Sequence, residues 1–199
     1  MAHRRKPLVI ALGLNTAVLA AEMLGGVAGN SFSLIMDGVH NISDELGIGF
    51  LVLAYTLRTG VSGNLLRSAN LFNSVGLLAV SGFLILRVVE HLFQPTPVLG
   101  LVSIIAGLIG ALGNWGVATV LRQPSKEDAA IRLAYVHNLA DTLLSLVPVA
   151  AGALTVALGN FLFDPLFALF IAGFIVITTL FALIGSRREF WWPERVVCK

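Results

Sequence analysis

The chain has 199 residues, of which 57% are hydrophobic and only 12% are charged, about half the roughly 25% found in soluble domains. So few charges cannot cover the surface of a soluble globule of this size. The 13 Lys and Arg exceed the 11 Asp and Glu by only two, so net charge indicates no nucleic-acid partner, and the single Cys198 excludes a disulfide framework or a thiolate metal cage. The composition predicts a protein that crosses the lipid bilayer several times.

Six apolar stretches are long enough to cross the hydrocarbon core, which needs about 20 residues per helix. In chain order they cover residues 7–28, 32–57, 65–93, 98–121, 129–158 and 165–185. Short breaks rich in Gly, Pro, Asn and Ser separate them. Because backbone in lipid must satisfy its own hydrogen bonds, we expect an all-α polytopic membrane protein with six transmembrane helices. They form a single domain over residues 1–199, with a short cytoplasmic tail at 186–199 and no cytoplasmic domain.

The basic residues predict the orientation of these helices in the cell membrane. Twelve of the thirteen Lys and Arg flank the N-terminus, the second and fourth breaks or the C-terminal tail. Only Arg87 lies towards the opposite side, inside the third stretch. Because cytoplasmic segments carry the excess of basic residues, both termini are expected in the cytoplasm.

Acidic residues inside apolar stretches are functional candidates, because an Asp at a helix centre costs about 2.5–3.5 kcal/mol on insertion scales. Glu22 lies near the outer end of the first stretch, where it serves either as an acid on the exit path or as a contact between helices. Asp37 lies towards the outer end of the second stretch. It either lines a release path or forms an ion pair with Arg87, which is similarly deep in the third stretch.

Two matching pairs of side chains lie deeper in the membrane. His40 and Asp44 in the second stretch, and His137 and Asp141 in the fifth, are each spaced four residues apart, which places both members on one helix face. Two such helices offer two nitrogen and two oxygen ligands, a set that suits Zn²⁺ and its neighbours rather than Mg²⁺ or Ca²⁺. The alternative is that each His–Asp pair only bonds one helix to another. Its repetition at the same depth favours a metal site.

Two further features lie beside these pairs. Asn41 and Asn138 each follow a His and either orient the ligands or form hydrogen bonds between helices. Pro148 lies one to two turns beyond Asp141. Because proline has no N–H to donate, it is expected to kink the fifth helix and leave the carbonyl of residue 144 unpaired.

Around these residues the sequence resembles the cation diffusion facilitator (CDF) family, the six-helix metal–proton antiporters. The resemblance covers roughly residues 15–187 and is carried by several short motifs in both halves of the chain. These motifs are Glu22–Gly26, Asn30–Leu34, Asp37–Asp44, Gln94–Pro97, His137–Ser145 and Asp164-Pro165. The two His-x-x-x-Asp motifs are similar to those of zinc-type members. Family members usually continue into a cytoplasmic metal-binding domain with a ferredoxin-like fold, which this chain is expected to lack.

The resemblance implies a transport site made of His40, Asp44, His137 and Asp141, and a homodimer with the third helix near its interface. It also implies alternating access coupled to inward proton flow. We therefore expect a secondary transporter that exports a divalent transition metal, Zn²⁺ first, with Co²⁺, Fe²⁺, Ni²⁺ and Cd²⁺ compatible with the same ligands. The alternative is a non-transporting membrane subunit or metal-binding scaffold. No nucleophile–base pair is present beyond the four residues, so no enzyme is expected.

Overall fold

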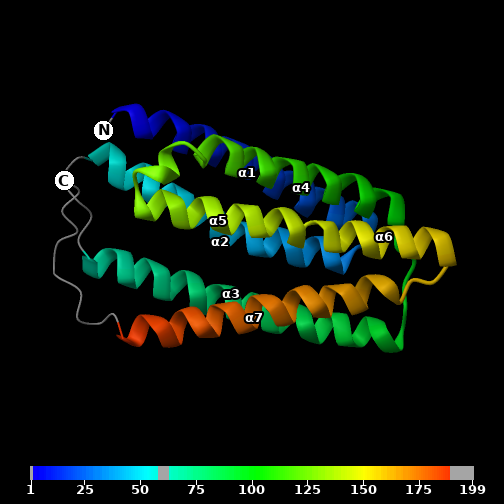
Figure 1. Ribbon diagram of the computed structural model, residues 1–199. Coiled ribbons are helices and arrows are strands. Elements are labelled where there is room, and N and C mark those ends of the chain that lie inside the picture. Colours follow the sequence, from blue (N-terminus) through cyan, green and yellow to red (C-terminus); the bar gives the residue numbers. More distant parts are fainter. Residues whose placement is uncertain (1, 58–62, 189–199) are drawn as a thin grey trace.

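Every element of the computed structural model, which describes residues 2–57 and 63–188, is helical. The long helices run side by side (Figure 1). In chain order the elements are α1 (Ala2–Gly29), α2 (Phe32–Leu57), α3 (Gly63–Phe93), α4 (Gly100–Leu121), the short 3-10 turn η1 (Pro124–Lys126), α5 (Ala129–Leu144), α6 (Leu146–Leu158) and α7 (Phe163–Arg188). The all-α prediction is confirmed for these residues. Residues 58–62 of the predicted second break and 189–199 of the predicted tail lie outside the described residues.

Five segments among the described residues are long and apolar enough to cross a membrane. They are Arg5–Gly29, Leu71–Phe93, Gly100–Leu121, Ala130–Leu158, which joins α5 to α6, and Phe163–Ile184. The remaining long helix, α2, has 26 residues but carries Asp37, Asp44 and Glu45 in its sequence. The protein is therefore a multi-pass membrane protein. α2, which is not among these five segments, carries more acidic residues than any other described helix.

The helices pack in two groups that meet at α2. α1 packs along α4 and α2, and α4 also contacts α5 and α6, whereas α3 packs mainly against α7. Figure 1 shows α3 and α7 as a pair beneath the other helices, and α2 contacts both members of that pair. The helix that holds His40 and Asp44 therefore contacts each of the other α-helices.

Small residues allow α4 and α6 to pack closely. A Cβ added to Gly100 would lie 2.6 Å from the carbonyl oxygen of Gly152, and one added to Gly152 would lie 2.5 Å from that of Gly100. Neither contact is sterically possible, so both positions require glycine. This is the small-residue packing that brings membrane helices close together.

The N-terminal end of α2 is fixed to α7 by a buried carboxylate. Asp164 accepts hydrogen bonds from the hydroxyls of Ser31 and Ser33, each at 2.6 Å, and from the backbone N–H of Phe32 at 2.6 Å. The negative charge also lies at the N-terminus of α2, where the helix dipole favours it. Asp164 thereby anchors the start of α2.

The C-terminal end of α2 is tied to the start of α5. The hydroxyl of Tyr55 donates a hydrogen bond to Asp128. Asp128 in turn caps α5 by accepting from the backbone N–H of Ala130 at 2.9 Å and of Ile131 at 3.2 Å. Because the end of one helix is joined to the beginning of the other, α2 and α5 run antiparallel. This geometry determines how their polar side chains meet.

The predicted kink in the fifth helix is confirmed. α5 ends at Leu144 and α6 begins at Leu146, with Ser145 between them and Pro148 in the first turn of α6. The N–H of Ser145 still donates to the carbonyl oxygen of Asp141 at 2.8 Å. The break therefore begins directly after the last turn that contains a predicted metal ligand.

Candidate metal centre

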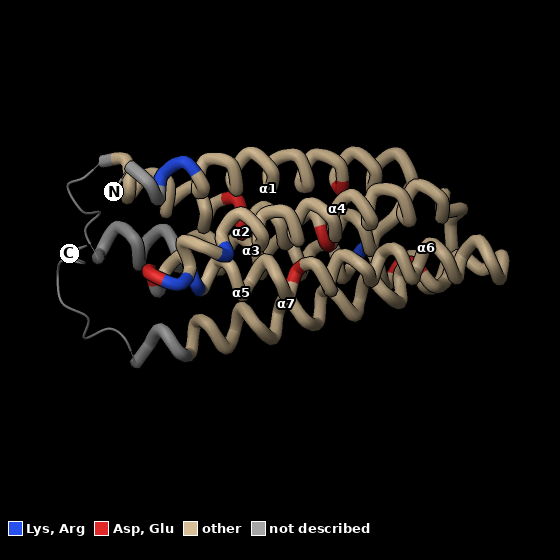
Figure 2. The backbone as a smooth tube through the Cα atoms, turned by 45° about the horizontal axis from the view of Figure 1, so that its top comes forward, with Lys and Arg blue, Asp and Glu red and all other residues tan. Residues whose placement is uncertain are grey.

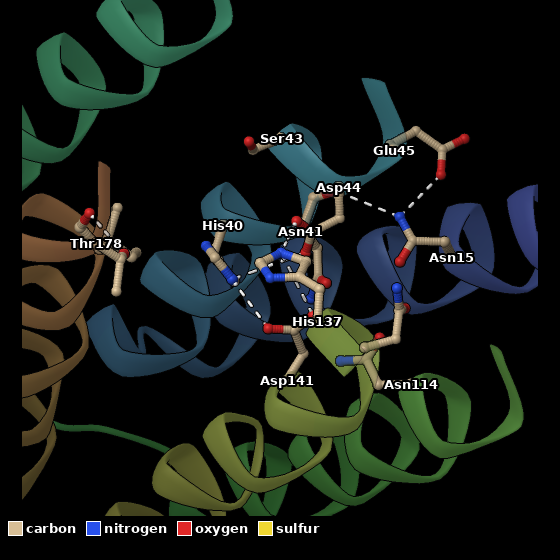
Figure 3. Close-up of polar contacts among 12 residues, drawn as sticks. Asn15, His40, Asn41, Ser43, Asp44, Glu45, Asn114, His137, Asp141 and Thr178 are labelled. Atoms are coloured by element: carbon tan, nitrogen blue, oxygen red, sulfur yellow. Dashed lines mark hydrogen bonds and ion pairs between the residues drawn. The ribbon is translucent and has the colours of Figure 1, made fainter. Parts of the chain in front are cut away.

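His40, Asp44, His137 and Asp141 come together where α2 faces α5 (Figure 3). Each histidine contacts the aspartate of the other helix. Nε2 of His40 lies 3.1 Å from Oδ1 of Asp141, and Nε2 of His137 lies 2.6 Å from Oδ1 of Asp44. Because α2 and α5 are antiparallel, His40 lies opposite Asp141 and Asp44 lies opposite His137. Antiparallel packing thus turns two identical motifs into two crossed pairs.

Contacts within each helix close the arrangement. Nε2 of His40 lies 3.8 Å from Oδ2 of Asp44, and Nε2 of His137 lies 3.7 Å from Oδ2 of Asp141. One ligand atom from each of the four residues lies within 4.8 Å of all the others. A tetrahedral Zn²⁺ with bonds of about 2.0–2.1 Å needs ligand atoms roughly 3.4 Å apart. The four side chains are therefore close to the spacing that such an ion requires.

Burial of the four side chains is uneven. His40, Asp44 and Asp141 are buried, whereas the side chain of His137 is 46% exposed. When both aspartates are ionised and both histidines are neutral, as metal binding requires, the four side chains carry a charge of −2, which a divalent cation neutralises. Because an uncompensated buried charge is costly, this donor set favours a dication over a monovalent ion. His137 is the member that an arriving ion can reach.

The two asparagines beside the histidines contact other groups. The amide Nδ2 of Asn41 donates to Oε2 of Glu22 at 2.5 Å, which connects α2 to α1. Nδ2 of Asn138 donates to the carbonyl oxygen of Ala134 in its own helix at 2.9 Å. Of the two alternatives for Asn41, the structure therefore contains the hydrogen bond between helices. Neither amide nitrogen donates to the four-residue group in the structure.

Of the two alternatives for Asp37, the ion pair with Arg87 is wrong. Nη1 of Arg87 lies 2.6 Å from Oε2 of Glu90, one turn further along α3, and both side chains are at least half exposed. Asp37 is 1% exposed and lies in the bundle, where Glu22 of α1 acts on it. Arg87 has an acidic partner on its own helix surface, so it does not need to enter the bundle.

Several buried polar residues were missed by the sequence reasoning. Nδ2 of Asn15 donates to Oε2 of Glu45 at 2.9 Å and to the carbonyl oxygen of Asn41 at 3.3 Å. Nδ2 of Asn114 donates to Oγ of Ser145 at 3.1 Å. Asparagine inside an apolar stretch is as unusual as an acid there, because its amide needs a partner. That signal was available for Asn15 and Asn114.

Comparison with known proteins identifies the family. A sequence profile described as the cation efflux transmembrane domain matches residues 8–190. The chain belongs to the cation efflux family. This is the CDF family that the motifs indicated, and its members are transporters rather than enzymes.

Named members of the cation efflux family align with most of the chain. A cadmium, cobalt and zinc/H(+)-K(+) antiporter of Bacillus subtilis is 26% identical over 178 residues, which are 84% of this chain and 57% of that protein. The zinc transporter ZitB of Pectobacterium atrosepticum is 23% identical over 188 residues, 90% of this chain and 58% of that protein. ZitB of Escherichia coli K12 is 24% identical over 179 residues, which are 85% of this chain and 57% of that protein. The chain thus spans less than two thirds of the length of these relatives.

Proposed function

We propose that this cation efflux chain exports a divalent transition metal, Zn²⁺ first, from the cytoplasm in exchange for protons. The ion is bound by His40 and Asp44 of α2 and by His137 and Asp141 of α5. The observation that carries the proposal is that one ligand atom from each of these four residues lies within 4.8 Å of the others. Residues 1–199 act as one transmembrane transport domain.

The choice of ion follows from the donor atoms. Two imidazole nitrogens and two carboxylate oxygens suit Zn²⁺, Co²⁺, Fe²⁺, Ni²⁺ and Cd²⁺, while Mg²⁺ and Ca²⁺ prefer oxygen alone. The names of the relatives, which include zinc, cadmium and cobalt, support the same group of ions. Zn²⁺ is placed first because it readily accepts four ligands in a tetrahedron.

Proton exchange follows from the same four side chains. Imidazole and carboxylate bind metal only after losing their protons, so metal and protons compete for the same atoms. An outward-facing site that picks up protons releases its ion, and an inward-facing site that loses them can bind the next. The word H(+) in the name of the Bacillus subtilis relative supports this direction of coupling.

For the topology we propose six membrane spans with both termini in the cytoplasm. α2 provides the sixth span, because its acidic side chains are covered by the other helices instead of lipid. Figure 2 shows that the Lys and Arg residues gather mostly towards the end of the molecule where α1 and α5 begin. The basic residues at that end include Arg5, Lys6, Arg122 and Arg132, and an excess of basic residues marks the cytoplasmic side.

We also propose a homodimer that forms through the membrane helices. α3 has contacts mainly with α7 and α2, and it carries large exposed apolar side chains. Leu71, Phe72, Phe83, Leu86 and Phe93 are each between 56% and 83% exposed. Lipid or a second copy of the chain must cover this face, and α3 is the helix that the family resemblance places near the dimer interface.

The proposed function is tested by transport in vesicles. The protein is reconstituted with a zinc-sensitive dye inside, a pH gradient is imposed, and wild type is compared with Asp44→Ala and Asp141→Ala. We expect pH-driven uptake by wild type and by the control Glu90→Gln, which alters an exposed acid on α3, and none by the two Ala variants. Undiminished uptake by both Ala variants would refute the site. Zinc binding by wild type without uptake would favour the scaffold alternative.

A further inference from the structure

A second pair of acids lies outside the four-residue metal centre. Glu22 on α1 and Asp37 on α2 are 0% and 1% exposed, and Glu22 accepts a hydrogen bond from Asn41, which lies one turn after Asp37 on the same face of α2. An ionised carboxylate only accepts hydrogen bonds, so two ionised carboxylates cannot bond to each other. A hydrogen bond between them requires a proton on one of the two.

The surroundings of Glu22 are built to hold a carboxyl group. Nδ2 of Asn41 donates to Oε2 at 2.5 Å, and the hydroxyl of Ser145 lies 3.5 Å from Oε1. Ser145 is itself held by Nδ2 of Asn114 at 3.1 Å. A Cβ added to Gly110 of α4 would lie 2.0 Å from Oε1 of Glu22, so only glycine leaves room for the acid. Donors from α2 and from the α5–α6 break therefore hold Glu22 against α4.

The charges around the pair do not compensate two negative groups. No Lys or Arg in the described residues forms an ion pair with either acid, and α4 and α6 contain no titratable residue. The groups that act on Asp37 are the hydroxyl of Ser145, His40 of its own helix, Glu22 of α1 and Asp141 of α5. On α3, Arg87 is paired with Glu90, and on α7, Asp164 is bound to the start of α2.

Asp37 has a carboxyl oxygen without a donor. Its Oδ2 is buried and has no hydrogen-bond partner among the described residues. Two neighbouring buried carboxyl groups favour one shared proton, because like charges that share a buried site cannot both be ionised. We propose that Glu22 and Asp37 bind one proton between them, and that this pair is a proton site of the transport cycle separate from the four metal ligands.

The position of the pair connects it to the metal centre. Asp37 lies one turn before His40 on α2, and Asn41, which donates to Glu22, directly follows His40. Ser145 lies at the break that directly follows the last turn of α5, the turn that holds Asp141. A movement of α2 or α5 that opens the metal centre must therefore displace the donors of Glu22. The loss of these donors changes how tightly the pair holds its proton.

The first test detects the proton without transport. The full chain in a detergent without ester groups is examined by infrared spectroscopy for the carbonyl band of a protonated carboxyl group at neutral pH. We expect the band in wild type and in Glu90→Gln, and its loss in both Glu22→Gln and Asp37→Asn. These substitutions preserve shape, and either variant alone decides the outcome if the other fails to fold. Absence of the band from wild type, or its persistence in the variants, would overturn the proposal.

The second test counts protons and rests on the proposed exchange of metal for protons. In wild type and both variants, protons moved per Zn²⁺ are measured during pH-driven uptake, together with Zn²⁺ bound per chain. We expect Zn²⁺ binding to the four ligands to be retained, with one proton fewer per ion in each variant. An unchanged proton count, or a second Zn²⁺ site that disappears in Glu22→Gln, would overturn the inference. Failure of wild type to transport would instead contradict the proposed function, while the infrared result would still decide the pair.

Discussion

Nε2 of His137 lies 2.6 Å from Oδ1 of Asp44, although 93 positions separate the two residues along the chain. Asp44 also faces His40 of its own helix, with Oδ2 3.8 Å from Nε2. One buried carboxylate therefore contacts both imidazoles of the proposed centre. Because Asp44 makes the shortest of the four His–Asp contacts, it is the ligand whose loss should disturb the site most.

Replacing Asp44 with Asn should abolish tight metal binding. The substitution removes one of two negative charges and leaves His137 facing a weaker acceptor. Losing one partner of a buried charged pair costs about 3–5 kcal/mol, which corresponds to roughly 10²–10⁴-fold in Zn²⁺ affinity. Isothermal titration of the purified protein with Zn²⁺ measures this change.

The matched control for this experiment is the neighbouring acid. Glu45 points to α1, where it accepts hydrogen bonds from Asn15 at 2.9 Å and Thr16 at 2.6 Å. Glu45→Gln removes a charge one residue away without touching the metal centre, so Zn²⁺ affinity should stay near that of wild type. Equal losses from both substitutions would mean that general charge, not ligation, determines binding.

Replacing His137 with Asp should change which metal is preferred. The donor set would change from two nitrogens and two oxygens to one nitrogen and three oxygens. Carboxylate ligands suit Mn²⁺ better than imidazole does, so the ratio of Mn²⁺ to Zn²⁺ uptake should rise. Competition between the two ions in proteoliposomes measures this ratio. The control His91→Asp changes a histidine on α3 that contacts Phe32 and the carbonyl oxygen of Arg87, and should leave the ratio unchanged.

The local part of the proposed site was predictable from sequence because helix geometry is regular. Four-residue spacing places His40 with Asp44, and His137 with Asp141, on common faces. The exchange of partners across α2 and α5 was not predictable from spacing. It depends on the antiparallel alignment that the Tyr55–Asp128 hydrogen bond supports at one end of the two helices.

Contacts between distant helices were predicted less well. Depth in the membrane suggested Arg87 as the partner of Asp37, but depth does not say which face of α3 points inward. The true neighbour of Asp37 is Glu22, another acid. Sequence reasoning favours opposite charges as partners, so two neighbouring acids are a pair that it misses. Recognising it requires the space that Gly110 leaves on α4.

Replacing Asp164 with Asn should destabilise the protein without weakening metal binding. Asp164 accepts from Ser31, Phe32 and Ser33 at the start of α2. Hydrogen bonds to a charged group contribute about 1.5–3 kcal/mol, so we expect a loss of about that size. Thermal unfolding in detergent and Zn²⁺ titration measure the two properties. Asn160→Ala serves as control, because Asn160 accepts one exposed backbone hydrogen bond from Leu162; a lost Zn²⁺ affinity in Asp164→Asn would contradict this purely structural role.

Replacing Gly110 with Ala should destabilise the protein through Glu22 alone. The new Cβ would lie 2.0 Å from Oε1 of Glu22 but 3.4 Å from Cβ of Ser145, so only the acid must move. Overpacking of this kind costs about 1–3 kcal/mol. The control Gly116→Ala, on the same helix, meets only a side-chain carbon of Leu14 at 3.7 Å, and should be neutral or gain up to about 1 kcal/mol from helix propensity.

A double-mutant cycle separates this steric effect from a general weakness of α4. In a Glu22→Ala background the clash at Gly110 no longer exists, so Gly110→Ala should become as harmless as Gly116→Ala. The two single losses will then fail to add, as expected for residues in direct contact. Equal losses in both backgrounds, measured by denaturant or thermal unfolding, would mean that Glu22 does not occupy the space beside Gly110. The same result would remove the structural basis of the shared proton, because α4 would no longer hold Glu22 next to Asp37.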